Sequence, residues 1–300
     1  MTSFFLPRSK DDFVALGYMA GWKIFGLLPE RVAYRIGNIA ADRVAANPAT
    51  TRQLRKNLAR VMGCPAEEVP QGLIRASMRS YLRYWVEAFR LPSIASPELA
   101  DTVESTSDGL ERVAEALEAG DSIVIPLPHS GNWDMAGMWL VSRHGRFSTV
   151  AERLKPEVLY DAFVEYRESL GFHILPLTGG KPAMPELQKR LEEGGVVCLL
   201  SDRDFGGHGV PVTFFGEQTT MPVGAAKLAQ DTGARLMPAG LSYTRDGWRF
   251  VAHPFVPTEG RELADIVQDI ATVFESDIAQ HPADWHMMQP LWPADKKRSK

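Results

Sequence analysis

The sequence predicts an α/β fold with a central sheet that is mostly parallel and partly mixed, flanked by helices and preceded by amphipathic N-terminal helices. Two observations predict this class. From about residue 108, short β-rich apolar runs alternate with helical patterns, which is typical of parallel strands joined by crossover helices. Later, residues 244–247 (Thr-Arg-Asp-Gly) lie between two alternating runs and indicate a hairpin turn, which predicts antiparallel strands in the late part of the sheet.

The first helix is predicted over 11–28, with an apolar face. The residues on that face are Phe13, Leu16, Gly17, Ala20, Ile24, Leu27 and Leu28. The apolar run from residue 13 to 28 extends only about 24 Å, against about 30 Å for a hydrocarbon core, so we expect an interfacial helix rather than a membrane span. Trp22 and Lys23 are expected near lipid headgroups. The alternative is a helix buried in the core or in a dimer interface.

Three more helices are predicted before the sheet, over 30–46, 49–62 and 70–91. The last of them carries Tyr81, Trp85 and Phe89 on one face, at a spacing of four. The α/β part then follows. Its predicted elements are helix 108–117, strand 122–127, a helix from about 132, strand 147–151, helix 156–170, strand 173–177, helix 183–193, strand 196–201, helix 222–232 and strand 235–243.

The overall composition is that of a globular protein. Of 300 residues, 45% are hydrophobic and 23% are charged, which excludes collagenous, disordered and disulfide-scaffold proteins. The two cysteines, Cys64 and Cys198, lie far apart and fit a reducing compartment. Because no repeat or low-complexity linker interrupts the chain, we expect a single domain over 1–300.

The charge is unevenly distributed along the chain. Residues 1–60 carry ten Lys/Arg and four Asp/Glu, a net +6, and the total of −4 therefore leaves −10 for residues 61–300. The acidic α/β part argues against a nucleic-acid partner. The N-terminal part is both basic and apolar, so we expect membrane-associating helices over 1–62 that bind an anionic membrane surface. The basic cluster expected to attract lipid consists of Arg52, Arg55, Lys56 and Arg60.

Polar residues follow three of the predicted strands, where the active sites of parallel sheets lie. In the first loop, His129 follows strand 122–127, and Asp134 lies in the opening turn of the next helix. The Asp134 carboxylate could accept a hydrogen bond from one imidazole nitrogen, which leaves the other free to take a proton from a hydroxyl. The alternative is that Asn132 or Asp134 caps the helix and His129 packs in the core.

The other two loops are less specific. The second offers Glu152 and Arg153, with Arg167 on the following helix, and these side chains could hold an anion or a sugar hydroxyl or could form a salt-bridged surface. In the third, Asp202 and Asp204 flank Arg203. These residues could supply another partner for His129 and a contact to a phosphate.

Several chemistries lack their motifs. There is no Gly-X-Ser-X-Gly elbow for a hydrolase serine, and the Gly-Gly pairs match neither the Walker nor the dinucleotide-binding pattern. The remaining histidines lack metal-ligand spacing, and neither cysteine has a Cys or His partner nearby. We therefore predict no metal and no nucleotide cofactor.

Several motifs of this chain resemble those of a known enzyme family. His129 and Asp134, separated by four residues after a buried strand, resemble the signature of glycerolipid-type acyltransferases. Segments 79–92, 202–204, 214–216 and 222–229 are similar, in this order, to the bacterial lipid A biosynthesis (lauroyl/myristoyl) acyltransferase family, over most of the chain. Segments 127–137, 150–157, 165–172, 175–180 and 282–286 resemble the mycobacterial branch of that family, which acylates phosphatidylinositol mannosides.

The resemblance implies a glycerolipid-acyltransferase-like fold and a peripheral enzyme at the cytoplasmic face of the plasma membrane. It implies transfer of a long acyl chain, typically palmitoyl, from acyl-CoA as co-substrate to a mannose hydroxyl of a phosphatidylinositol mannoside. His129 would be the base that activates the hydroxyl, and Asp134 would complete its motif. Asp202, at a position where the resemblance leads us to expect Glu, would form a charge relay with His129.

The resemblance also implies a set of substrate-binding residues. The positions expected to hold the mannose and phosphoinositol groups are Glu152, Arg167, Arg203 and His286, with Arg153 beside them. A hydroxyl can attack a thioester directly, so no covalent intermediate is expected. The candidates for stabilising charge on the thioester oxygen are the amides of Ser130, Gly131 and Asn132, at a helix start.

Two alternatives remain. A late lipid A-type acyltransferase would share the fold and the base, but would use acyl-carrier protein as donor and a glucosamine-based acceptor. A non-catalytic membrane lipid-binding protein would share the amphipathic N-terminus, but would not require His129 and Asp134 together.

Overall fold

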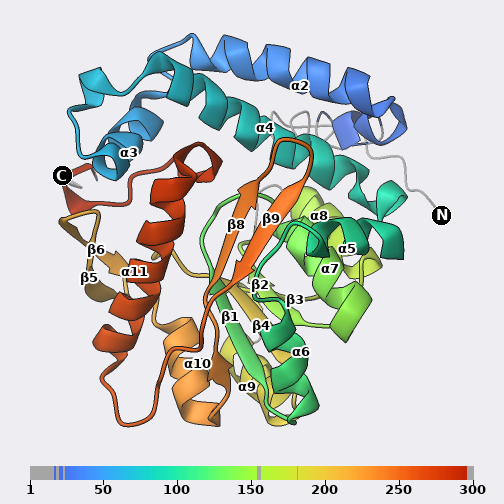
Figure 1. The fold of residues 1–300 in the computed structure, drawn as a ribbon, viewed down its shortest axis with the longest axis vertical. Helices are drawn as coiled ribbons and strands as arrows, with labels where there is room; N and C mark the ends of the chain where they lie inside the picture. Colours follow the sequence, from blue (N-terminus) through green and yellow to red (C-terminus); the bar gives the residue numbers. More distant parts are fainter. Residues whose placement is uncertain (1–16, 18–19, 23, 154–156, 181, 296–300) are drawn as a thin grey trace.

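The centre of the molecule is a five-stranded sheet in which all neighbouring strands are parallel. The computed structural model describes residues 17, 20–22, 24–153, 157–180 and 182–295. The order of the strands across the sheet is β3 (His173–Pro176), β2 (Ser148–Ala151), β4 (Val196–Leu200), β1 (Ile123–Leu127) and β7 (Arg235–Leu236). Helices cover both faces of this sheet (Figure 1). The α/β class with a mostly parallel sheet is therefore confirmed.

The predicted antiparallel strands lie outside the central sheet. The predicted hairpin is a separate two-stranded sheet of β8 (Ala239–Tyr243) and β9 (Trp248–Ala252). A second two-stranded sheet, which the sequence did not predict, pairs β5 (Val210–Phe214) with β6 (Glu217–Met221). The predicted strand 235–243 is split into β7 and β8 at Pro238, which has no N–H to donate to a ladder. The expectation of a partly mixed central sheet is corrected accordingly, although the hairpin turn after β8 is where the sequence predicts it.

Side chains of β1 alternate between two hydrophobic cores, as a strand buried on both faces requires. Ile123, Ile125 and Leu127 belong to one core, and Val124 belongs to the other. Helices that contribute to the first core are α4 (Gln71–Ile94), α5 (Pro97–Glu104), α6 (Glu111–Glu118), α7 (Trp133–His144) and α8 (Glu157–Ser169). Those of the second core are α9 (Ala183–Glu192), α10 (Gly224–Thr232) and α11 (Leu263–Gln280).

Apart from helix 11–28 and strand 235–243, the predicted helices and strands are found within a few residues of their expected bounds, with three omissions. The sequence did not predict α5, α11 or the hairpin of β5 and β6. Three short 3-10 helices complete the described elements, η1 (Ala66–Glu68), η2 (Pro282–Asp284) and η3 (Pro293–Asp295).

Helix α2 (Glu30–Ala45) lies alongside α4, at the top of Figure 1. It packs closely on α4 because its buried residues are small. A Cβ at Gly37 would lie only 3.1 Å from Val86 Cγ2. The opposite side of α2 is apolar but exposed, with Val32, Ile36 and Ile39 at 43%, 43% and 44% exposure.

Only part of the predicted helix 11–28 is described. Residues 17, 20–22 and 24–27 are helical, whereas Lys23 and the start of the helix lie outside the described residues. Ile24 and Leu27 are strongly exposed, at 56% and 86%. Trp22, expected near lipid headgroups, instead packs its ring against Phe89, Phe163 and Tyr166. Within the described part of the chain, no helix is long and apolar enough to cross a membrane.

The basic cluster on α3 (Arg52–Met62) also differs from expectation. Lys56 Nζ lies 2.8 Å from Asp295 Oδ1, and Arg60 Nη1 lies 2.7 Å from Asp295 Oδ2. The Arg55 guanidinium donates to the carbonyl of Val69 and to Gln71. Three of the four residues expected to attract anionic lipid therefore hold α3 against other parts of the fold.

Candidate active site

A large cleft opens at the carboxyl ends of the parallel strands. Its volume is about 790 Å³, and its lining includes residues that follow β1, β2 and β4, namely His129, Glu152, Ser201 and Arg203. This is the edge of the sheet where sequence analysis placed the polar loops.

His129 is paired with Asp202, a fully buried carboxylate. His129 Nδ1 lies 2.5 Å from Asp202 Oδ1, while Asp202 Oδ2 accepts hydrogen bonds from the His129 amide and from Trp285 Nε1, both at 3.0 Å. Burial alone would raise the pKa of Asp202, but the facing His129 and these hydrogen bonds outweigh burial and hold the pKa below its usual value. An ionised Asp202 keeps the proton on His129 Nδ1, which leaves Nε2 as the unprotonated nitrogen.

Asp134 has other partners, so the prediction that it contacts His129 directly is corrected. It lies buried in the first turn of α7 and accepts hydrogen bonds from Arg167 Nε and from the Tyr84 hydroxyl, both at 2.8 Å. Burial lowers the pKa of Arg167, but Asp134 and the neighbouring tyrosines more than compensate and raise it overall. Arg167 is therefore a fixed cation at the edge of the cleft.

Three of the four remaining substrate-binding candidates line the cleft. Glu152 is exposed there, and the Arg203 guanidinium lies over the Phe205 ring, with its carbon 4.1 Å from the ring centroid. His286 is also in the lining. Arg153 is the exception, because it lies outside this lining and binds Glu157 and the carbonyl of Gly179.

His286 is buried, and its ring contacts a hydrogen-bonded pair formed by Ser80 and Asp284. Its Nε2 lies 2.9 Å from the Ser80 hydroxyl, which is 2.7 Å from Asp284 Oδ1. Burial, followed by the positive charge that His129 carries when protonated, lowers the pKa of His286 to about 3. The imidazole is thus neutral at physiological pH.

Two of the three amides proposed to stabilise negative charge are already hydrogen-bonded within the chain. The amide of Ser130 donates to the Pro128 carbonyl at 2.7 Å, and that of Gly131 donates to the Asp284 carbonyl at 2.9 Å. Gly131 has φ +56°, and a Cβ there would lie 2.9 Å from the backbone of Leu241, so the turn requires glycine. In this conformation the Ser130 and Gly131 amides are not available to a substrate.

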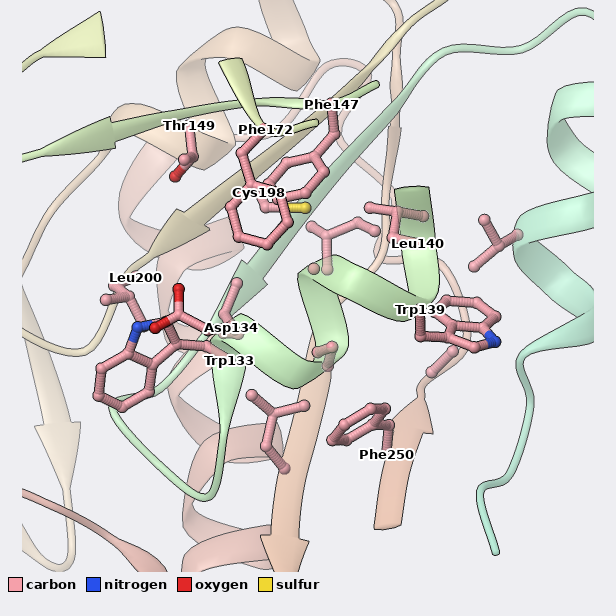
Figure 2. Close-up of a pocket in the computed structure, with 18 of the residues that line it drawn as sticks. Trp133, Asp134, Trp139, Leu140, Phe147, Thr149, Phe172, Cys198, Leu200 and Phe250 are labelled. Atoms are coloured by element: carbon pink, nitrogen blue, oxygen red, sulfur yellow. The ribbon is translucent and has the colours of Figure 1, made fainter. Parts of the chain in front are cut away.

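A second, apolar cavity adjoins the cleft and is lined by residues of α7, the central sheet and the β8–β9 hairpin (Figure 2). Its volume is about 100 Å³. Trp133 and Arg167 line both this pocket and the cleft, so they form part of the partition between the two. The sides of the pocket are formed by Phe147, Phe172, Cys198 and other apolar side chains. Its mostly apolar lining suits a hydrocarbon group.

Sequence reasoning missed several residues of the site. Trp285 was not recognised as the second side-chain partner of Asp202, nor Tyr84 as a partner of Asp134. The ring of Trp133, which lies 5.8 Å from that of His129, was also not considered. Their positions depend on tertiary contacts that no local motif reveals. Among the described residues, no group of three or more His, Cys, Asp or Glu side chains could hold a metal ion.

Known proteins of one family are similar to this chain over nearly its whole length. The model of the family described as "Bacterial lipid A biosynthesis acyltransferase" matches residues 8–294. The chain is 51% identical over 297 residues to a phosphatidylinositol mannoside acyltransferase of Mycobacterium tuberculosis (strain ATCC 25618 / H37Rv). These residues make up 98% of this chain and 94% of that protein. It is 50% identical over 281 residues to the protein of the same name from Mycolicibacterium smegmatis (strain ATCC 700084 / mc(2)155), with 93% and 91% covered. The chain therefore belongs to the bacterial lipid A biosynthesis acyltransferase family, and it is an acyltransferase.

Proposed function

We propose that this protein transfers a palmitoyl group from palmitoyl-CoA to a mannose hydroxyl of a phosphatidylinositol mannoside. The acceptor is inferred from the names of relatives that are about half identical over nearly the whole chain. The single observation that carries the chemistry is the His129–Asp202 pair, which lies in a cleft next to an apolar pocket.

His129 is the general base in this proposal. Its Nε2 takes the proton of the mannose hydroxyl as that oxygen attacks the thioester carbonyl. The resulting tetrahedral species collapses, the carbon–sulfur bond breaks, and the proton passes from His129 to the departing thiolate of coenzyme A. Direct attack needs no covalent enzyme intermediate. Asp202 stabilises the imidazolium that forms during the step.

Arg167 is our candidate for stabilising the negative charge that develops on the thioester oxygen. Its guanidinium is held by Asp134 at the partition between the cleft and the apolar pocket. A thioester whose acyl chain enters the pocket places its carbonyl near this partition. A fixed cation in a site shielded from water stabilises such a charge strongly.

Part of the acyl chain enters the apolar pocket lined by Trp133 in this proposal. Three residues that line this pocket and not the cleft, Ala136, Thr149 and Cys198, retain partial exposure because they face an empty space. The larger cleft is left for the mannose and phosphoinositol groups, near Glu152, Arg203 and His286.

The protein acts, in our proposal, as a peripheral protein at the cytoplasmic face of the plasma membrane. The outer face of α2, formed by Val32, Ile36 and Ile39, is the docking surface, together with Ile24 and Leu27. Exposed arginines on α2 would contact anionic headgroups. These arginines are Arg31, Arg35 and Arg43.

The test is acyl transfer from palmitoyl-CoA to purified mono- and dimannosylated phosphatidylinositol. Wild type is expected to acylate the mannolipid, and His129→Ala is expected to lose the activity. His253→Ala is a matched control, because His253 is also paired with an aspartate, Asp277 at 2.8 Å, but does not line the cleft. Transfer only to a lipid A precursor would refute the acceptor, and an active His129→Ala variant would refute the mechanism.

A further inference from the structure

Glu87 is a buried carboxylate that lines neither the cleft nor the apolar pocket. It lies in the middle of α4 and is only 1% exposed. A buried charge persists in a fold only when it is paired and hydrogen-bonded. One of the hydrogen bonds that pair Glu87 comes from Asn132, which lies between His129 and Asp134.

Four side chains from four parts of the fold donate hydrogen bonds to this one carboxylate. Oε1 accepts from the Tyr34 hydroxyl of α2 at 2.8 Å and from Arg83 Nε at 2.7 Å. Oε2 accepts from Asn132 Nδ2 at 2.7 Å and from Trp248 Nε1 of β9 at 2.8 Å. Both oxygens are therefore fully used, and the carboxylate cannot rotate without losing donors.

Asn132 transmits this fixed position to the active site. It is completely buried and forms the N-cap of α7, where its Oδ1 accepts a hydrogen bond from the Met135 amide at 2.9 Å. One side-chain amide thus caps the helix with its oxygen and reaches Glu87 with its nitrogen. Asn132 lies three residues after His129 and two before Asp134, inside the turn that joins them.

We propose that Glu87 is a positioning residue for acyl transfer, which holds the turn from His129 to Asp134 in register through the side-chain amide of Asn132. The proposal rests on the proposed function of His129 as base. Glu87 touches no substrate in this account. It acts by fixing where α7 begins, and with it Asp134, its partner Arg167 and the backbone that carries His129.

The decisive variant is Glu87→Gln, which keeps the shape and removes one acceptor. If its amide oxygen stays with Arg83 and Tyr34, its NH₂ group faces two other donors, Asn132 Nδ2 and Trp248 Nε1, and neither of them then has an acceptor. We expect kcat to fall roughly 10- to 100-fold, because a misplacement of about 1 Å is enough for such a loss. The KM for palmitoyl-CoA should change less than about twofold, since Glu87 contacts neither cavity.

Combining Glu87→Gln with Asn132→Asp should restore part of the lost kcat. Asn132→Asp keeps an N-cap acceptor for Met135 but places two carboxylates against each other, so this variant should also lose kcat. In the double variant, the NH₂ of the glutamine donates to the new aspartate. We expect its kcat to exceed that of either single variant, which would show that Glu87 acts through Asn132.

Tyr34→Phe is the matched control, because it removes one donor from the same carboxylate, on the oxygen that does not contact Asn132. We expect its kcat to stay within about twofold of wild type, whatever its melting temperature. The inference is overturned if Glu87→Gln retains its kcat, or if all variants lose activity in proportion to their melting temperatures and the double variant shows no recovery. Wild-type activity measured in parallel separates this outcome from failure of the proposed function itself.

Discussion

Replacing Asp202 by Asn tests the tautomer of His129. Two N–H groups, from the His129 backbone and from Trp285, point at Asp202 Oδ2, whereas only His129 Nδ1 points at Oδ1. An asparagine must place its single oxygen on one side. We expect the oxygen to face the two N–H groups, which leaves the NH₂ group facing the imidazole. His129 Nδ1 then becomes an acceptor, and the proton moves to Nε2, the nitrogen that has to act as base.

The energies decide between the two orientations. The reverse orientation would leave two buried N–H donors without acceptors, at about 1–3 kcal/mol each. A neutral imidazole, in contrast, changes tautomer at little cost, so the orientation that blocks catalysis is favoured by about 2–6 kcal/mol. A base held in the wrong tautomer loses about 10⁴-fold in kcat. This corresponds to about 5.5 kcal/mol of transition-state stabilisation.

The assay is kcat for palmitoyl transfer, together with ¹⁵N NMR of the His129 ring. The wild-type ring should carry its proton on Nδ1 and the Asp202→Asn ring on Nε2. Asp277→Asn is the control, because it makes the same change at another histidine–aspartate pair, His253–Asp277, and should leave kcat within about twofold. An Asp202→Asn enzyme within tenfold of wild type, or one that retains the Nδ1 proton, would refute the reasoning.

Three further predictions concern the pocket, the loop after β4 and the membrane. Cys198→Phe should reduce the ratio of kcat/KM for palmitoyl-CoA to that for octanoyl-CoA about 15-fold. The larger side chain excludes two CH₂ groups of the acyl chain from the pocket, at a cost of about 1.6 kcal/mol. The measurement is kcat/KM across acyl-CoA chain lengths. Burial raises the pKa of Asp204, but hydrogen bonds from the Gly209 amide and the Thr220 hydroxyl outweigh it and lower the pKa overall. The ionised Asp204 therefore stabilises the folded protein at neutral pH, and this contribution is lost below about pH 4. In urea melts, Asp204→Asn should have a lower free energy of unfolding than wild type at neutral pH, and the difference should disappear on acidification. Ile36→Asp should weaken sedimentation with anionic vesicles roughly tenfold without lowering the melting temperature, while Asn38→Asp, with the same added charge, should weaken it less.

The partner of His129 illustrates what local sequence can and cannot predict. The strand-end position of His129 follows from the apolar run before it, and the sequence predicts that position correctly. The choice between Asp134 and Asp202 depends on strand order. Because β1 pairs directly with β4, Leu127 lies opposite Leu200, and the residues two positions beyond them, His129 and Asp202, come together. Neither the pairing nor its register can be read from periodicity within a single strand.

The missed elements have a similar cause. The hairpin of β5 and β6 turns at Phe215-Gly216, with both residues at positive φ, but the first central residue is an aromatic rather than the usual Asn or Asp. The aromatic cluster of Trp285 and Trp292 against Phe214 also joins segments distant in sequence. Local patterns therefore predict the helices and strands, whereas the contacts that complete the site arise from tertiary packing.

The two buried aspartates, Asp134 and Asp202, support opposite charges that develop in the proposed reaction. Proton removal from the hydroxyl creates a positive charge on His129, and attack on the thioester creates a negative charge on its oxygen. Asp202 lies against the first of these charges, and Arg167, fixed by Asp134, is our candidate partner for the second. Asp202 is fully buried, and Arg167 is half-buried and held by Asp134. Both are oriented before the reaction begins, so little reorganisation is needed as the charges develop. The aspartate of the His129 turn thus acts through Arg167, while an aspartate from a neighbouring strand orients the base.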